Sequence, residues 1–319
     1  MKTRHFQFLF NAFLTASIVG LFTACGGNTK MSDPASPTPP APPPAPTKQF
    51  PFSKHVVLVM EENQAYSTVA GNTTAWPHLN SMIAKGALAT NYYADAHFSI
   101  PNYFMLTTGQ TLTFDDNSTM VWNLDNIARR MLASNVSFKV YAEGITNGYL
   151  GGNTGLYVIR HNPFALLSDV ANSKQVASQV LWPFTQFGAD LSKNALPQFS
   201  FIVPDINDDA HTGTPQQADS WLQANVLGPV SVNPAFQSGG DGILIVAFDE
   251  ADTADKAHGG GHIVAAFWGS NVKPGYAQAS STVYQHESML RTVMEALQLP
   301  NPPGAAAVAP DMSEFFVLK

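Results

Sequence analysis

Short apolar segments alternate along this chain with longer segments that have a helical pattern. The apolar segments predict strands at 55–60, 137–141, 199–203, 242–248 and 262–268. The helical patterns predict helices at 77–85, 101–108, 215–227 and 284–297. Segments such as 242–248 are apolar at every position, which is typical of strands buried on both faces. The alternation therefore predicts an α/β fold with a mostly parallel sheet covered by helices on both sides.

Proline, glycine and threonine mark several of the predicted helix boundaries. Pro101 suits a first helical position, because its fixed φ is helical and its missing N–H would be unpaired there. Gly109 ends that helix, and Thr214 provides an N-cap for the helix that opens at Pro215. Ser99 then lies beside a helix N-terminus, where free N–H groups favour an anion. Taken alone, the same pattern also describes a capped helix start without chemistry.

The first 49 residues differ from the rest of the chain. Basic residues precede an apolar run that ends at Ala24-Cys25, which resembles a bacterial lipoprotein signal in which Cys25 would be lipidated. Residues 25–49 are rich in proline and predict a tether. We therefore expect a signal peptide at 1–24, a tether at 25–49 and one domain at 50–319. This organisation predicts export and lipid anchoring in the bacterial cell envelope (periplasm or outer membrane), with plain secretion or a retained anchor as the alternatives.

The overall composition excludes some classes of function. The 319 residues carry a formal charge of −7, and no run of lysine or arginine is present, which argues against nucleic acid as a partner. The single cysteine, Cys25, lies in the predicted signal region. The domain therefore has neither a disulfide nor a thiol nucleophile.

Polar residues follow the carboxyl ends of four predicted strands, the edge at which open parallel sheets bind ligands. They are Glu62-Asn63, Glu143, the pair Asp208 and His211, and Asp249-Glu250. Carboxylate and carboxamide oxygens suit a hard divalent cation, so the sequence predicts one Ca²⁺, Mg²⁺ or Mn²⁺ ion held by Glu62, Asn63, Asp249, Glu250 and Ser99.

A cation beside Ser99 would make its hydroxyl a usable nucleophile. We expect His97, His211 and His262 to hold phosphoryl oxygens or to protonate the leaving alcohol. Asn102 would donate to an oxygen that gains charge in the transition state. The sequence contains no phosphate-binding Gly-x-x-x-x-Gly-Lys loop, no Gly-x-Ser-x-Gly elbow and no His-Glu-x-x-His helix.

In order and spacing, these motifs together resemble one family, the bacterial and fungal phosphoesterases. That family includes acid phosphatases and phosphatidylcholine-type phospholipases C and is related to the alkaline phosphatase superfamily. The motifs are Met60-Glu61-Glu62-Asn63, His97-x-Ser99-x-Pro101-Asn102-Tyr103, Phe201-Ile202-Val203-Pro204 with Asn207-Asp208-x-x-His211, Ala218-Asp219-Ser220-Trp221-Leu222, Phe248-Asp249-Glu250 with His262, and His286-Glu287-Ser288-Met289.

The resemblance implies an alkaline-phosphatase-like α/β/α sandwich and a phosphoserine intermediate formed at a metal. It carries the ligand roles to the five residues named above, and the phosphate-contacting roles to Asn102, His211 and His262, and further to His97 and His161. Three departures stand out. Phe98 replaces a usual proline. Glu61 doubles the acid before Asn63, so either glutamate could be the ligand, and we take Glu62 because it adjoins Asn63. Asp208 and Asp209 both lie in the middle motif and are alternative metal ligands.

The leading hypothesis is a metal-dependent, acid-phosphatase-like phosphomonoesterase acting on a phosphate-ester substrate. The alternatives are a phospholipase C that acts on membrane phospholipids and a non-catalytic surface binding protein. Apart from the contact that the resemblance implies for His161, the sequence itself assigns no role to His161, Glu143, Asp208, Asp219 or His286.

Overall fold

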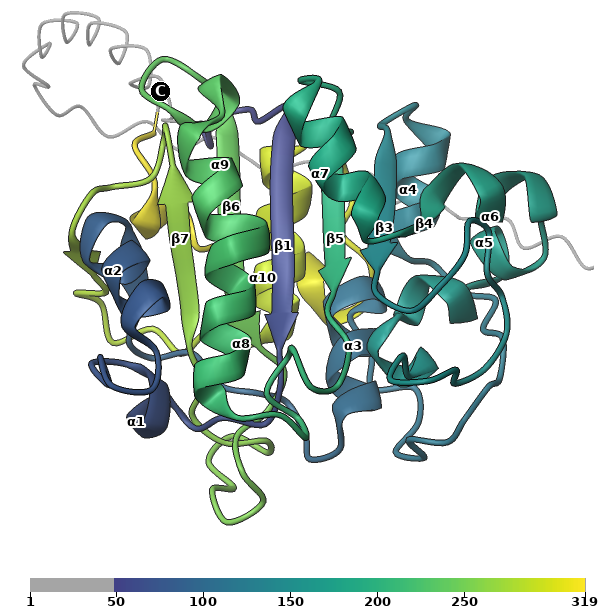
Figure 1. Ribbon diagram of the computed structural model, residues 1–319, viewed down its shortest axis with the longest axis horizontal. Helices are drawn as coiled ribbons and strands as arrows, with labels where there is room; N and C mark the ends of the chain where they lie inside the picture. Colours follow the sequence, from purple (N-terminus) through teal and green to yellow (C-terminus); the bar gives the residue numbers. More distant parts are fainter. Residues whose placement is uncertain (1–48, 319) are drawn as a thin grey trace, which may run out of the picture. The chain divides into compact units, whose positions relative to one another are not determined.

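The computed structural model describes residues 49–318, and an eight-stranded sheet forms its centre (Figure 1). The strand order is β4-β3-β5-β1-β6-β7-β2-β8. The strands are β1 (His55–Glu61), β2 (Ala87–Ala89), β3 (Phe138–Ala142), β4 (Leu181–Pro183), β5 (Phe199–Val203), β6 (Gly242–Phe248), β7 (Ala265–Gly269) and β8 (Tyr276–Ala277). All five strands predicted from the sequence are present, whereas the three shortest were not predicted.

Strand pairing brings one end of several strands to a common edge. The strands β4, β3, β5, β1 and β6 are parallel to their neighbours, whereas β7 runs antiparallel to both β6 and β2. The carboxyl ends of β3, β5, β1 and β6 therefore meet at the same edge as the start of β7. The prediction of a mostly parallel sheet is confirmed.

Helices cover both faces of the sheet and give three layers. In Figure 1, α2, α7, α8 and α9 lie in front of the sheet and α10 lies behind it, where it packs against α3. The α-helices are α1 (Tyr66–Val69), α2 (Pro77–Lys85), α3 (Ser99–Thr108), α4 (Ile127–Ala133), α5 (Ser168–Ala171), α6 (Lys174–Val180), α7 (Thr185–Ser192), α8 (Pro215–Leu222), α9 (Gly228–Val232) and α10 (His286–Ala296). Shorter turns are η1 (Ile159–His161), η2 (Pro163–Leu166), η4 (Pro234–Phe236), η5 (Gly304–Ala307) and η6 (Ser313–Phe315), and η3 (Gln223–Leu227) is a π-helical turn.

The two helical layers explain why the central strands are apolar throughout. Residues 56–60 of β1 and 243–248 of β6 are at most 1% exposed. Because each of these strands has helices on both sides, successive side chains pointing in opposite directions all enter a core. Trp76 packs edge-on against Phe248 with ring centroids 5.3 Å apart, which joins the start of α2 to the sheet.

Several boundaries differ from those predicted, including those of α10, which spans His286–Ala296 rather than 284–297. Helix α3 begins at Ser99 rather than Pro101, because Asp116 Oδ1 accepts the Ile100 N–H at 3.1 Å and caps the helix from a distant loop. Pro101 remains within the first turn, where no N–H is needed. The segment 215–227 is not one α-helix but α8 followed by a π-helical turn. The strand expected at 262–268 starts at Ala265, so His262 lies in the loop before it.

The N-terminal predictions cannot be compared with the structure. The signal peptide, Cys25 and all but the last residue of the tether lie outside the described residues. None of the helices within residues 49–318 is both long and apolar enough to cross a membrane.

The start of α2 is held by a side chain from α8. Asp219 is 1% exposed, and its two carboxylate oxygens accept the N–H groups of His78 at 3.0 Å and Leu79 at 2.8 Å. The N-cap residue of α2, Trp76, makes no side-chain cap of its own. Asp219 therefore satisfies the free N–H groups of a helix 140 residues away and ties α2 to α8.

Replacing Asp219 with alanine is expected to lower the free energy of unfolding by about 2 kcal/mol, because two N–H groups lose their acceptors. Urea denaturation followed by circular dichroism would measure the change. The matched control is Asp115→Ala, because Asp115 is exposed and accepts only the N–H of Asn117. The control is expected to change stability by less than about 0.5 kcal/mol. Equal losses in the two variants would contradict the capping role.

Candidate active site

Four of the predicted metal ligands meet at the carboxyl edge of the sheet. Ser99, at the first position of α3, is 2% exposed and donates its Oγ hydrogen to Glu62 Oε2 at 3.0 Å. Glu62 follows β1, and Asp249 follows β6, the neighbouring strand. The backbone N–H of Asn63 donates to Asp249 Oδ1 at 3.0 Å, which joins the two strand ends.

Two oxygens in this group are buried without a hydrogen-bond partner among the described residues, Asn63 Oδ1 and Asp249 Oδ2. Buried polar atoms without a partner are rare in proteins because each is costly. Burial, and then the nearby Asp249, raise the pKa of the Glu62 carboxyl well above its usual range. Burial also raises the pKa of Asp249 to about 6. Carboxylate and carboxamide oxygens that are close together and shielded from water are suited to bind a hard divalent cation.

The structure distinguishes the two adjacent glutamates. The two side chains leave the end of β1 in opposite directions, and it is Glu62 that contacts Ser99. Both carboxylate oxygens of Glu61 are buried without a partner. Burial raises the pKa of Glu61, and the next contributions come from Asp209 and Asp219. Glu62 is therefore the glutamate that can share a cation with Ser99.

Glu250, the fifth predicted ligand, has one oxygen committed to a histidine. His97 Nδ1 lies 2.6 Å from Glu250 Oε2, and His97 Nε2 lies 2.6 Å from the carbonyl oxygen of Asp255. A carbonyl only accepts, so Nε2 carries a proton and both ring nitrogens are occupied. Burial, followed by the charge of Asp249, raises the pKa of Glu250 to about 9. His97, predicted to contact phosphate, instead braces the loop before Ser99.

Asn102 is also committed to that loop. Its Oδ1 accepts the N–H groups of Asp95 at 3.0 Å and Ala96 at 3.2 Å. Its Nδ2 donates to the carbonyl oxygens of Ala96 at 2.8 Å and Phe98 at 3.0 Å. The side chain is fully buried and all four of its hydrogen-bonding positions are filled. The predicted contact of Asn102 with phosphate would require breaking one of these bonds, so the geometry gives it a positioning role.

The residue before the serine has a strained backbone. Phe98 has φ 71° and ψ 149°, a region that favours glycine, and its side chain is 54% exposed. Proline could not adopt a positive φ at this position. The hydrogen bond from Asn102 to the Phe98 carbonyl helps hold this conformation.

The glycine run 259–261 forms a wall for the same loop. Gly260 N–H donates to the Ala94 carbonyl at 3.1 Å, and Ala94 N–H donates to the Gly261 carbonyl at 3.0 Å. A Cβ atom at Gly259 would lie 2.1 Å from the carbonyl oxygen of Asp95. These glycines therefore allow two backbone segments to approach more closely than larger residues would permit.

His161, unassigned from the sequence, connects Glu62 to Asp209. Its Nδ1 lies 3.1 Å from Asp209 Oδ2 and its Nε2 lies 3.2 Å from Glu62 Oε1. Tyr103 stacks on the imidazole at 5.3 Å and donates its hydroxyl hydrogen to Glu62 Oε1. Burial lowers the pKa of His161 well below its usual range, so the ring is neutral. Glu62, His161 and Asp209 also form a buried group close enough to share a metal ion.

His211 lies on the other side of His161, against an arginine that sequence reasoning missed. The two imidazole centroids are 5.8 Å apart, and Arg160 Nη2 lies 3.1 Å from His211 Nε2. Burial, and then the charge of Arg160, lower the pKa of His211. The sequence could have indicated Arg160 as a site residue, because it is directly next to His161 and is one of few basic residues near the site motifs.

His262 is not joined to Ser99 or Glu62 by any hydrogen bond of the described residues. Its ring stacks between Tyr66 at 4.2 Å and Tyr93 at 4.7 Å. Its Nε2 donates to the carbonyl oxygen of Thr90 at 3.0 Å. His262 precedes β7 and so lies near the predicted edge of the sheet. Its ring, however, is stacked between two tyrosines rather than turned towards Ser99 or Glu62 by a hydrogen bond.

Three other residues without an assigned role support the backbone at this edge. His286 Nε2 donates to the Asp249 carbonyl at 2.7 Å, which fixes the end of β6. Glu143 accepts the Asp205 N–H and the Trp221 indole N–H, each at 3.0 Å. Asp208 accepts from Gln217 Nε2 at 3.0 Å.

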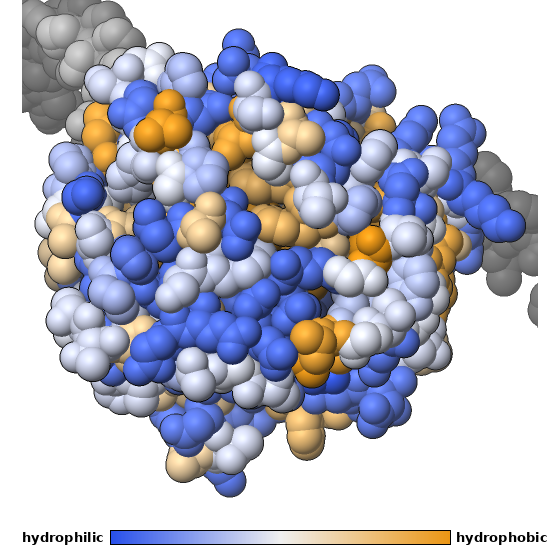
Figure 2. Space-filling model, in the orientation of Figure 1, coloured by the Kyte–Doolittle hydropathy of each residue, from blue (hydrophilic) through white to orange (hydrophobic). Residues whose placement is uncertain are grey.

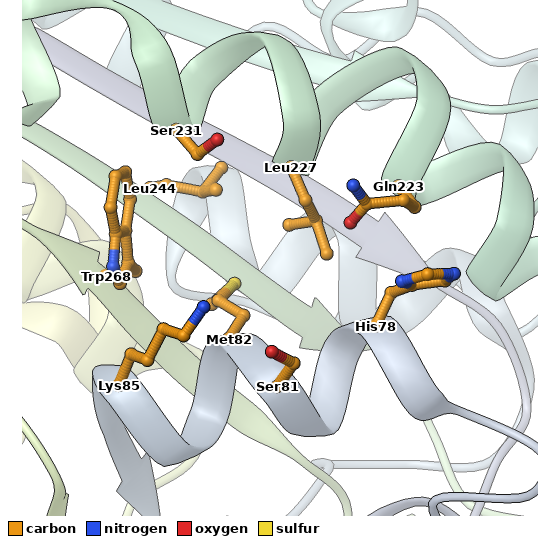
Figure 3. Close-up of a pocket in the computed structure, with 9 residues that line it drawn as sticks. All are labelled: His78, Ser81, Met82, Lys85, Gln223, Leu227, Ser231, Leu244 and Trp268. Carbon is orange, nitrogen blue, oxygen red and sulfur yellow. The ribbon is translucent and has the colours of Figure 1, made fainter.

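The surface near this end of the sheet is mainly polar. Figure 2 shows mainly hydrophilic residues across the lower part of the face, towards the end at which β1 and β5 terminate in Figure 1. A cavity of about 250 Å³ lies elsewhere, between α2 and the α8–α9 segment (Figure 3). Its lining includes His78, Lys85 and Trp268, and none of the candidate active-site residues.

Comparisons with known proteins point in one direction. A family model described as the phosphoesterase family matches residues 72–300. The phosphatidylinositol-3-phosphatase of Mycobacterium tuberculosis is 29% identical over 270 residues, covering 84% of each chain. A probable acid phosphatase of Kluyveromyces lactis is 28% identical over 260 residues, covering 78% of this chain and 59% of that protein.

A solved structure shows the same architecture. A Vibrio parahaemolyticus protein in the alkaline phosphatase superfamily superimposes with a TM-score of 0.51 at 13% identity, covering 83% of this chain and 75% of that one. This similarity shows the fold alone. The expected alkaline-phosphatase-like α/β/α sandwich is confirmed.

Proposed function

Because the chain belongs to the phosphoesterase family and is a phosphoric ester hydrolase, we propose that it hydrolyses phosphomonoesters through a phosphoserine on Ser99. The observation that carries this proposal is the hydrogen bond of 3.0 Å from buried Ser99 Oγ to Glu62 Oε2. The two relatives described above are both phosphatases, which supports a monoester substrate.

The proposed first step transfers the phosphoryl group to the serine. Ser99 Oγ attacks phosphorus while its proton passes to Glu62 Oε2, the hydrogen-bond acceptor that it already has. The ester oxygen leaves and takes a proton from bulk water to give the alcohol, and Glu62 returns its proton to Ser99 Oγ in the second step. Water then attacks phosphoserine, so that inorganic phosphate departs and the Ser99 hydroxyl is restored.

The surrounding residues have separate roles in this proposal. His211 contacts a phosphoryl oxygen, whereas His97 and Asn102 fix the loop that carries Ser99. Glu250 holds His97 in place through the contact of 2.6 Å. His262 stays outside the chemistry because its ring and Nε2 are committed to neighbouring groups.

One divalent cation completes the proposed site. Glu62, Asn63, Asp249 and Ser99 would hold it, and the unpartnered oxygens of Asn63 and Asp249 support this assignment. All the donors are oxygens, which suits Ca²⁺, Mg²⁺ or Mn²⁺. A bound cation supplies positive charge that offsets the buried carboxylates and lowers the pKa of the serine hydroxyl.

The Ser99→Ala variant is expected to lose at least about 10³-fold in kcat/KM for p-nitrophenyl phosphate, because no nucleophile remains. The control is Ser168→Ala, since Ser168 also occupies the first position of a helix. Acid quenching of the parent enzyme during turnover should trap one phosphoryl group on Ser99, detected by peptide mass spectrometry. Undiminished activity of Ser99→Ala would exclude the proposed nucleophile.

A metal-binding measurement should show which of the two adjacent glutamates, Glu61 or Glu62, is the metal ligand. Titration of chelator-treated protein with Mn²⁺ by calorimetry is expected to show one site, which is lost in Glu62→Gln and kept in Glu61→Gln. Burial raises the pKa of Asp249 to about 6, so ion binding displaces a proton and affinity should rise from pH 5 to pH 7. Loss of binding in Glu61→Gln alone would reassign the ligand.

A phospholipase C is the competing enzymatic hypothesis. It would release diacylglycerol from phosphatidylcholine micelles and act poorly on soluble monoesters. The phosphatase names of the matched relatives favour the monoesterase, so a lipid-borne monoester belongs in the substrate panel beside the soluble ones.

The proposed cellular location is the bacterial envelope, with the chain anchored by a lipid on Cys25. The signal-like order of residues 1–25 supports this proposal. We expect the full-length protein to fractionate with membranes and a Cys25→Ser variant to appear in the soluble fraction. A mature protein found in the soluble fraction with unmodified Cys25 would instead favour plain secretion.

A further inference from the structure

Two nitrogen atoms beside the proposed nucleophile are buried and have no acceptor among the described residues. They are Arg160 Nε and His211 Nδ1. A guanidinium only donates, so in the contact of 3.1 Å between Arg160 Nη2 and His211 Nε2 the imidazole nitrogen must accept. A neutral His211 then carries its proton on Nδ1. Both unpartnered nitrogens are therefore donors, and the pair lacks an acceptor.

This donor pair is close to the reacting serine. The His211 ring lies 5.8 Å from the His161 ring, and His161 Nε2 lies 3.2 Å from Glu62 Oε1. Glu62 in turn accepts the hydrogen of Ser99 Oγ through its other oxygen. One imidazole thus separates the donor pair from the carboxylate that contacts the nucleophile.

The acidic groups near the pair have other partners. Asp209 Oδ1 accepts the backbone N–H of His211 at 2.8 Å, and Asp209 Oδ2 faces His161. Asp116 Oδ1 accepts the N–H of Ile100 in the first turn of α3. The nearby carboxylates are therefore engaged with other groups, and the two donors of the pair stay without an acceptor among the described residues.

The backbone fixes Arg160 in this position. It lies in the turn η1, whose first N–H, from Ile159, is accepted by Asn153 Oδ1 at 2.9 Å. The next residue, His161, is 1% exposed and contacts two carboxylates. The contact with His211 then orients the guanidinium, and a donor that is already oriented loses less freedom when it binds an anion.

We infer that Arg160 is a specificity-determining residue that recognises the third non-bridging oxygen of a phosphomonoester. The inference rests on the proposed function. A monoester presents three such oxygens and a charge near −2 at neutral pH, whereas a diester presents two and carries an ester group in place of the third. The guanidinium, a forked and permanently charged donor, therefore stabilises a bound monoester more than a bound diester. Arg160 therefore selects monoesters over diesters.

The experiment compares Arg160→Gln and Arg160→Lys on two substrates, p-nitrophenyl phosphate and bis(p-nitrophenyl) phosphate. Loss of a charge-assisted hydrogen bond is expected to lower kcat/KM for the monoester by roughly 10- to 100-fold in Arg160→Gln. The value for the diester should change less than about threefold, and Arg160→Lys should recover part of the loss by keeping the charge. Arg130→Gln is the control, because Arg130 pairs with Asp125 in α4, away from the site.

A binding measurement keeps the inference testable without turnover. In a metal-loaded Ser99→Ala background, inorganic phosphate at pH 8 should bind more weakly by a similar factor when Arg160→Gln is added. Equal loss on both substrates, or unchanged phosphate affinity, would overturn the inference. Activity that persists in Ser99→Ala would instead refute the proposed nucleophile, and the phosphate titration would still report on Arg160.

Discussion

The arrangement of the site depends on two carboxylates placed together out of water. Glu62 and Asp249 follow neighbouring parallel strands, so the sheet register itself brings them to one point. Desolvation and mutual repulsion make that arrangement unfavourable unless protons or a cation offset the charge. Two contacts stabilise the pair: Ser99 donates a hydrogen bond to Glu62, and His286 binds the backbone carbonyl of Asp249 at the end of β6.

The second constraint is the shape of the loop before Ser99. Four hydrogen bonds from Asn102, the contacts of His97 and the close approach of the glycine run hold it from three sides. The positive φ of Phe98 is sustained by that support. His97 and Asn102, which are of residue types common in catalysis, therefore position the Ser99 side chain, and fewer side chains remain to contact the substrate.

Much of the fold could be predicted from the sequence, because buried strands such as 242–248 and local signals such as Thr214-Pro215 act over short distances. The sequence also identified the clusters at the sheet edge. It could not reveal what depends on distant contacts, such as the cap that Asp219 gives to α2 or the start of α3 set by Asp116. Asn102 and His262 were assigned by residue type, whereas their roles depend on hydrogen bonds that only the folded chain defines.

The hydrogen bonds of Asn102 join residues that are close in the sequence, whereas the hydrogen bond between Asn63 and Asp249 joins residues that are far apart in it. Asn102 binds residues only four to seven positions away, so its loop requires little chain entropy to form. Asn63 and Asp249 are separated by 186 positions and meet only when β1 and β6 are paired. The hydrogen bonds of Asn102 can therefore form early in folding, whereas the contacts of His97 with Glu250 and Asp255, and the pairing of Asn63 with Asp249, need the finished sheet. A partly folded chain thus has at most the local turn around Ser99, without the distant contacts that fix its shape or the carboxylates that lie beside the serine.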